Sequence, residues 1–118
     1  APCASEKKMT ELDRAPFGMS QIEITLGLAI TNLVVPGHLD FPTLISKLST
    51  NPAKALKLDK GTLAIGAAAD VTIIDPEAIW VVDPSQFTSL STNPPFRGLQ
   101  LTGRADTVIV DGKIKLQR

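Results

Sequence analysis

The residue types that most often carry catalysis or bind metal ions are scarce in this chain. It has one cysteine, Cys3, and one histidine, His38. Zinc in proteins needs three or four ligands, so these two residues cannot form a zinc site by themselves. A nucleophilic pair of Cys3 with His38 is an alternative, but nothing in the sequence orients the imidazole. A lone histidine beside a glycine is more typical of a solvated loop than of a ligand or a base.

Composition argues against several other ligand classes. The chain has 118 residues, with 12 basic and 12 acidic side chains, and so lacks the clustered basic face of a nucleic-acid-binding protein. Gly61 and Gly66 make no phosphate loop, because no glycine-rich turn follows a strand and opens a helix. The longest apolar run, residues 22–35, is too short and too polar to span a membrane. We expect a globular protein whose partners are neither nucleic acid nor a membrane.

The single cysteine also bears on the compartment. It excludes a disulfide within the chain and fits a reducing environment. Glu6, Lys7 and Lys8 fall where the apolar core of a signal peptide would begin. We therefore expect a cytoplasmic protein.

The chain begins with a long irregular segment, residues 1–18, which is polar and interrupted by prolines. A frayed chain terminus is one explanation. A functional loop is the other, because a long ordered loop before a buried element usually has a role. The following helix is predicted over residues 20–35, with Ser20 as its N-cap, Glu23 completing a capping box and Gly37 ending it. This helix is apolar on most sides and needs more cover than a chain of this length offers.

Two more helices are expected before the pattern changes. Asp40 can cap a helix that presents Leu44, Ile45 and Leu48 on one face. A third, shorter helix is predicted to begin at Asn51 as its cap, with Pro52 at the first helical position.

From residue 61 onward the periodicity is that of strands. Short β-rich runs are expected at residues 62–65, 71–74 and 80–82, followed by a Ser/Thr/Pro-rich loop. Asp111-Gly112, between runs of alternating apolar residues, predicts a type I′ hairpin. The chain therefore divides near residue 60 into a helical half and a β half.

Several motifs together resemble one enzyme family. They occur in this order: Ala1-Pro2, Glu6-Lys7, Arg14-Ala15-Pro16-Phe17-Gly18, Ile22-Glu23, Asn51-Pro52-Ala53-Lys54, Lys60-Gly61-Thr62-Leu63, Ala69-Asp70-Val71, Asp75-Pro76, Asn93-Pro94-Pro95-Phe96 and Val108-Ile109-Val110-Asp111-Gly112-Lys113. The set resembles the part of dihydroorotases, within the amidohydrolase superfamily, that follows the last catalytic strand. The later motifs are general to the β-sandwich tail of that superfamily, whereas Ala-Pro-Phe-Gly followed by Ile-Glu points more narrowly to dihydroorotase.

The resemblance implies an α/β fold. Residues 1–59 would form the C-terminal end of a metal-dependent (β/α)8 TIM barrel, comprising the loop after strand 8 and the terminal helices. Residues 60–118 would form part of a small β-sandwich. In the family, two zinc ions held by histidines and a modified lysine activate a hydroxide, and an aspartate on the eighth strand is the general base and acid. The reaction is the reversible hydrolysis of dihydroorotate to N-carbamoyl-aspartate in pyrimidine biosynthesis. By alignment that aspartate would lie two positions before Ala1. We therefore expect no catalytic residue and no metal ligand in this chain, no cofactor on it alone, and no activity without the rest of the barrel.

Three positions match substrate contacts of the family. Phe17 and Gly18 stand where backbone groups address the pyrimidine ring, although Phe17 can equally pack against the helix. Cys3 stands where family members commonly carry a histidine that contacts the substrate carboxylate. A thiol is a weak donor without positive charge, so this departure weakens either substrate affinity or the assignment.

The partners implied are the missing N-terminal part of the barrel, the small-molecule substrate, and either further copies of the protein or aspartate transcarbamoylase. Other functions remain open. The parent protein can be a non-catalytic dihydroorotase homologue that serves as a scaffold for aspartate transcarbamoylase, or a cyclic amidase of the allantoinase or hydantoinase type. A separate β-rich interaction module with helical extensions is a third class, which would be a stable monomer in isolation.

Overall fold

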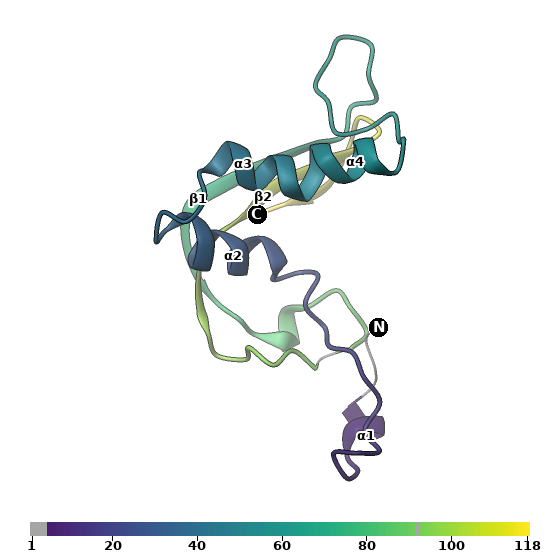
Figure 1. Cartoon of the computed structure of the whole chain (residues 1–118), viewed down its shortest axis with the longest axis vertical. Coiled ribbons are helices and arrows are strands. Elements are labelled where there is room, and N and C mark those ends of the chain that lie inside the picture. The colour runs from purple at the N-terminus through teal and green to yellow at the C-terminus, as the bar shows by residue number, and fades with distance from the viewer. Residues whose placement is uncertain (1–4, 92) are drawn as a thin grey trace. The chain divides into compact units, whose positions relative to one another are not determined.

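The computed structural model describes residues 5–91 and 93–118 (Figure 1). The elements in chain order are α1 (Ser5–Lys8), α2 (Thr25–Ala29), a π-helical turn (Ile30–Val34), α3 (Phe41–Ile45), a second π-helical turn (Ser46–Thr50), α4 (Asn51–Ala55), β1 (Val71–Val81), a 3-10 turn (Pro84–Gln86), β2 (Gln100–Val110) and β3 (Lys113–Gln117). The chain forms two compact units. One joins the described residues up to Thr25 with Ile79–Leu101, and the other joins Leu26–Ala78 with Thr102–Arg118.

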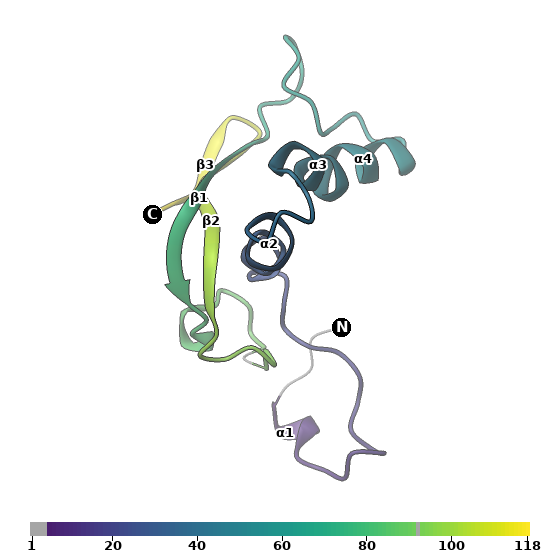
Figure 2. The same ribbon diagram turned by 60° about the vertical axis from the view of Figure 1, so that its left-hand side comes forward.

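The second unit is a helical layer on a three-stranded sheet with strand order β1-β2-β3. Figure 2 shows α2, α3 and α4 on one side of this sheet. Ile30, Leu44 and Ala53 are buried there. The Thr102 N–H donates to the Thr31 hydroxyl at 2.8 Å, which joins the helical layer to β2.

The start of the apolar helix differs from the prediction. The α-helix begins at Thr25, and neither Ser20 nor Glu23 caps it, because both side chains bond to residues 88–91 instead. The end of the helix is as predicted. Gly37 takes a φ of +78°, and its N–H donates to the Val34 carbonyl at 2.9 Å.

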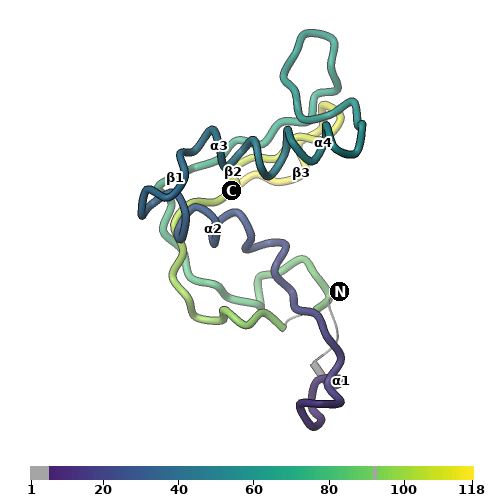
Figure 3. Tube along the Cα trace, viewed as in Figure 1, coloured from purple at the N-terminus to yellow at the C-terminus, as the bar shows by residue number. Residues whose placement is uncertain are grey.

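The second predicted helix is confirmed at its start, where the Thr43 N–H donates to the Asp40 carboxylate at 2.8 Å. The third predicted helix is present as α4 (Asn51–Ala55), but it is not a separate element, because it continues α3 through the second π-helical turn. The chain is helical without interruption from Phe41 to Ala55 (Figure 3). Asn51 is inside this helix rather than a cap: its N–H donates to the Ser46 carbonyl, and its side-chain oxygen accepts from the Ser46 hydroxyl. The π-helical turn thus carries the helix across Pro52, which has no N–H to contribute.

The β half contains one long strand where two short ones were predicted. Residues 71–74 and 80–82 lie almost entirely on β1, which runs through Pro76. A proline is tolerated there because β1 is an edge strand. The strand predicted at residues 62–65 is wrong. That segment is irregular, and Leu63 and Ile65 are almost fully exposed, so no strand among the described residues pairs with it.

The predicted hairpin is confirmed. β2 and β3 pair antiparallel, with Val110 opposite Lys113. Asp111 and Gly112 take φ values of +49° and +71°, the left-handed conformation that a type I′ turn requires. A register shift between Val108 and Ile109 marks a bulge in β2.

Asp70 braces this hairpin against the loop before β1. Its carboxylate accepts from Lys60 Nζ at 2.5 Å and from the Asp111 N–H at 2.8 Å. The hydrogen bond from Lys60, followed by that from the Asp111 N–H, holds the pKa of Asp70 below its ordinary value of 3.8. The same contact raises the pKa of Lys60 above 10.5.

Candidate functional site

Two of the three residues expected to contact a substrate, Phe17 and Gly18, belong to the first compact unit. Cys3 lies outside the described residues. The Phe17 side chain is 99% exposed, so it does not pack against the helix, which was the alternative explanation for it. Gly18 has a φ of +108°, a conformation open to glycine and rarely adopted by other residues. Residues 16–18, a segment that we call the Phe17 turn, therefore present an aromatic ring to solvent beside a glycine whose backbone conformation would be strained for other residues.

Lys8 bridges this turn. Its ammonium group donates to the Pro16 carbonyl and to the Gly18 carbonyl, at 2.6 Å in each case. Both acceptors flank Phe17, so one charged donor holds the two ends of the turn together. Sequence reasoning missed this role, because nothing in a polar stretch indicates which of two adjacent lysines will reach carbonyls eight and ten residues away.

The segment after the turn is attached to a second loop far along the chain. The Ser20 hydroxyl donates to the Ser91 hydroxyl at 2.6 Å, and both serines are buried. The Ser20 N–H donates to the Asn93 carbonyl at 3.1 Å. Ser20 thus pairs with the 88–93 loop through its side chain and its backbone at once.

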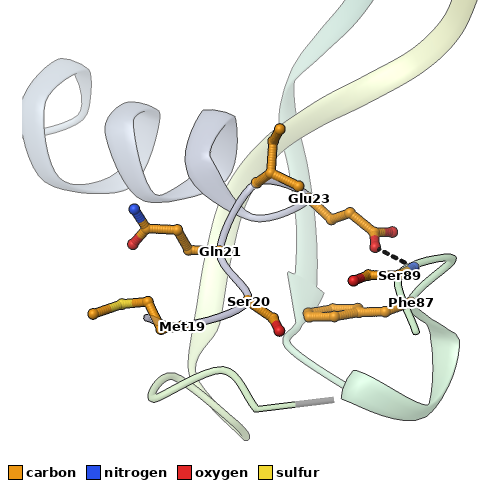
Figure 4. A pocket seen from close by; sticks show the side chains of 7 residues that line it. Met19, Ser20, Gln21, Glu23, Phe87 and Ser89 are labelled. Atoms are coloured by element: carbon orange, nitrogen blue, oxygen red, sulfur yellow. Dashed lines mark hydrogen bonds between the residues drawn. The ribbon is translucent and has the colours of Figure 1, made fainter. Parts of the chain in front are cut away.

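Glu23 adds two further bonds to the same loop. One carboxylate oxygen accepts from the Thr88 N–H at 3.1 Å, and the other accepts from the Ser89 N–H at 2.9 Å. Figure 4 shows this side chain reaching across to Ser89. A carboxylate that accepts from two successive peptide N–H groups is a strong anchor for a loop. It is also a poor candidate for a general base, because both its oxygens are already engaged.

A small cavity lies beside these contacts (Figure 4). It has a volume of about 180 Å³ and a mainly apolar lining. The lining residues are Met19, Ser20, Gln21, Ile22, Glu23, Phe87 and Ser89. At this size and polarity the cavity can take an apolar group, but it offers no acid–base pair.

The described residues do not supply a metal centre. No group of three or more His, Cys, Asp or Glu side chains comes together within residues 5–91 and 93–118. His38 is an exposed residue in the connection between the first π-helical turn and α3. The described side chains thus do not fit a zinc site. Nor does any helix in the described part of the chain have the length and apolarity needed to cross a membrane.

Comparison with known proteins gives the context of this loop. The model of the amidohydrolase family matches residues 9–115. The chain is 45% identical over 117 residues to a dihydroorotase of Pelotomaculum thermopropionicum, covering 99% of this chain and 27% of the relative. A dihydroorotase of Clostridium acetobutylicum is 42% identical over 114 residues, again 27% of its length. The resemblance to dihydroorotases noted in the motifs is thereby confirmed, and the chain spans about a quarter of these relatives.

Solved structures of hydantoinases have a similar fold. The L-hydantoinase (dihydropyrimidinase) of Arthrobacter aurescens matches 91% of this chain and 24% of its own, with a TM-score of 0.83 and 33% identity. A D-hydantoinase (dihydropyrimidinase) from Thermus sp. matches 98% of this chain and 26% of its own, with a TM-score of 0.87 and 29% identity. The backbone arrangement described above is thus an amidohydrolase-type fold.

Proposed function

Because this chain belongs to the amidohydrolase family, we propose that it is the C-terminal portion of a dihydroorotase, the enzyme that reversibly hydrolyses dihydroorotate to N-carbamoyl-aspartate. The observation that carries this proposal is the identity of 42–45% to dihydroorotases over almost the whole chain. The hydantoinase structures are 24–33% identical. The relatives are nearly four times as long as the chain, so the activity belongs to the whole protein.

The proposal assigns residues 1–59 to the terminal loop and helices of a (β/α)8 barrel and residues 60–118 to its β-sandwich tail. Active sites of such barrels lie on the loops after the strands. The Phe17 turn would then belong to the loop after the last strand. This assignment accounts for a loop that exposes Phe17 and is held by Lys8.

In this proposal the chain contributes binding rather than chemistry. The Gly18 carbonyl is engaged by Lys8, and so we assign the peptide N–H groups at Phe17 and Gly18 as the donors to the cyclic amide. The positive φ of Gly18 lets the backbone approach a ligand closely. Cys3 would face the substrate carboxylate with a neutral thiol. Zinc, the catalytic aspartate and the metal ligands would reside in the portion of the relatives that this chain does not span.

Two alternatives are retained. A non-catalytic homologue that serves as a scaffold for aspartate transcarbamoylase would share this fold and these sequence matches. Cys3, which stands where family members commonly carry a histidine, favours this scaffold alternative. Another cyclic amidase is favoured by the structural likeness to hydantoinases. For the dihydroorotase we propose a cytoplasmic location and a partner that is either another copy of the protein or aspartate transcarbamoylase.

The test begins with the reading frame and the intact mass of the natural polypeptide. The full-length protein is then assayed with dihydroorotate, a hydantoin and dihydrouracil as competing cyclic amides, with zinc supplied and with zinc chelated. A dihydroorotase hydrolyses the first substrate far faster than the other two and loses this activity on chelation. Hydrolysis of hydantoin alone indicates the second alternative. Absence of all hydrolysis, together with co-purification with aspartate transcarbamoylase, indicates the scaffold.

A further inference from the structure

We propose that Glu23 is a positioning residue for the Phe17 turn at residues 16–18, acting by tying the segment after the turn to the 88–93 loop. This inference rests on the function proposed above for the turn. It starts from the two bonds that the Glu23 carboxylate accepts from the Thr88 and Ser89 N–H groups. These partners lie 65 and 66 residues away along the chain.

The position of Glu23 in the sequence suggests that it belongs to a helix capping box, but in the structure Glu23 does not have this role. In a capping box Glu23 would accept from the N–H of the helix cap. Here the helix begins only at Thr25, and the carboxylate points to the other loop (Figure 4). Its bonds therefore do not stabilise the start of α2, and their structural effect is to hold two loops of one compact unit together.

The attachment reaches the turn through Ser20, which is separated from Gly18 by one residue. Ser20 bonds to Ser91 through its hydroxyl and to Asn93 through its N–H. Together with the two bonds of Glu23, these contacts join Ser20 and Glu23 to four described residues of the loop: Thr88, Ser89, Ser91 and Asn93. Residues 16–18 are thus anchored directly after their C-terminal end, while Lys8 holds the turn itself.

The consequence for catalysis follows from preorganisation. A loop that must be ordered when substrate binds costs binding free energy, whereas a loop held in place beforehand does not. Glu23 contacts no reacting atom in this scheme. Its loss should weaken substrate binding through disorder of the turn and leave the chemical step nearly intact.

The decisive variant is Glu23→Gln in the full-length protein. Glutamine has the same shape, but one of its two terminal groups is a donor and cannot accept an N–H. We expect faster amide hydrogen exchange at residues 14–19 and at Thr88 and Ser89. For dihydroorotate we expect KM to rise roughly 5-fold or more while kcat stays within about 2-fold. Glu23→Asp, which keeps both acceptor oxygens on a shorter side chain, should restore part of the protection.

Glu11→Gln is the matched control. Glu11 precedes the turn on the same loop, its side chain is 77% exposed, and its carboxylate lies 3.9 Å from Arg14 Nε. The hydrogen bonds that the Glu11 carbonyl accepts from the Arg14 and Ala15 N–H groups involve the backbone, which Glu11→Gln keeps. This variant should change neither the exchange at residues 14–19 nor KM. Unchanged exchange at residues 14–19 in Glu23→Gln overturns the proposal, as does a kcat loss without a change in KM. If the unmodified full-length protein does not hydrolyse dihydroorotate, the proposed function fails instead. The exchange data then still decide whether Glu23 orders the turn.

Discussion

Ile30 packs so closely on the backbone of Gly103 that a methyl group placed on Gly103 would overlap the Ile30 side chain. Gly103 is buried on β2 and has a φ of +81°. The absence of a side chain there is what lets the helical layer approach the sheet of the second unit.

Gly103→Ala should therefore destabilise the protein strongly. The backbone strain of a non-glycine residue at this φ is added to the overlap with Ile30, for a total of about 2–4 kcal/mol. Gly37→Ala is the control: its φ of +78° is nearly the same, but a Cβ there meets nothing within 4 Å, so only the strain of about 1–2 kcal/mol remains. Denaturant unfolding of both variants gives the difference, and equal losses would contradict the close packing.

Lys8 should matter for substrate binding and Lys7 should not. Lys8→Met removes the ammonium that bridges the Pro16 and Gly18 carbonyls while keeping a long side chain. We expect KM for dihydroorotate to rise about 3- to 10-fold, because the turn loses its charged donor. Lys7→Met serves as the control, since Lys7 is an exposed neighbour. Steady-state kinetics of the full-length variants measure the effect, and the same KM for both would exclude the bridge.

The brace between Lys60, Asp70 and Asp111 predicts a pH dependence of stability. Because the pKa of Asp70 is lowered in the folded protein, its ionised carboxylate stabilises the fold fully above about pH 3.8. This stabilisation is lost as the pH falls through the pKa that Asp70 has in the folded state. Because the pKa of Lys60 is raised in the folded protein, its charged ammonium stabilises the fold fully below pH 10.5. This stabilisation is lost as the pH rises through the pKa that Lys60 has in the folded state. Both side chains are partly exposed, so the effect is modest.

Asp70→Asn should accordingly lower the melting temperature most between about pH 3.8 and pH 10.5, where both Asp70 and Lys60 are charged. The difference from the unmodified protein should shrink in more acidic and in more alkaline solution. Melting curves across this pH range test the prediction, with Glu77→Gln, an exposed carboxylate on β1, for comparison. A difference that does not vary with pH would show that the ionised pair is not its origin.

Restoring a histidine at position 3 should strengthen binding if the chain is part of a dihydroorotase. Cys3→His replaces a neutral thiol by a side chain that can donate a charge-assisted hydrogen bond to a carboxylate. We expect a KM for dihydroorotate that is lower by roughly 10-fold, with the larger gain below the histidine pKa of about 6.5. A KM that does not respond at any pH would remove Cys3 from the substrate site.

The parts of the fold that sequence reasoning anticipated are those decided by neighbouring residues. The Asp111-Gly112 turn needs two successive residues with positive φ, and the Asp40 cap needs one carboxylate three residues before an N–H. Both signals lie within a few positions, so a sequence pattern contains all the necessary information.

What sequence reasoning missed depends on residues that are distant along the chain. Ser20 and Glu23 match a capping box locally, yet their partners lie 65–71 residues away, and tertiary contact overrides the local preference. The apolar alternation at residues 62–65 has the periodicity of a strand but no pairing strand among the described residues. The family motifs led to the prediction that Phe17 and Gly18 contact a substrate, which stays a prediction, and gave no indication of the Lys8 bridge beside them.

The assignment as a dihydroorotase is tested most sharply by the ratio of kcat/KM for dihydroorotate to kcat/KM for an unsubstituted hydantoin, measured on the full-length protein with zinc. A dihydroorotase recognises the substrate carboxylate and the ring together, so we expect a ratio above about 100. A ratio near or below one, or no turnover of dihydroorotate at all, would contradict the assignment.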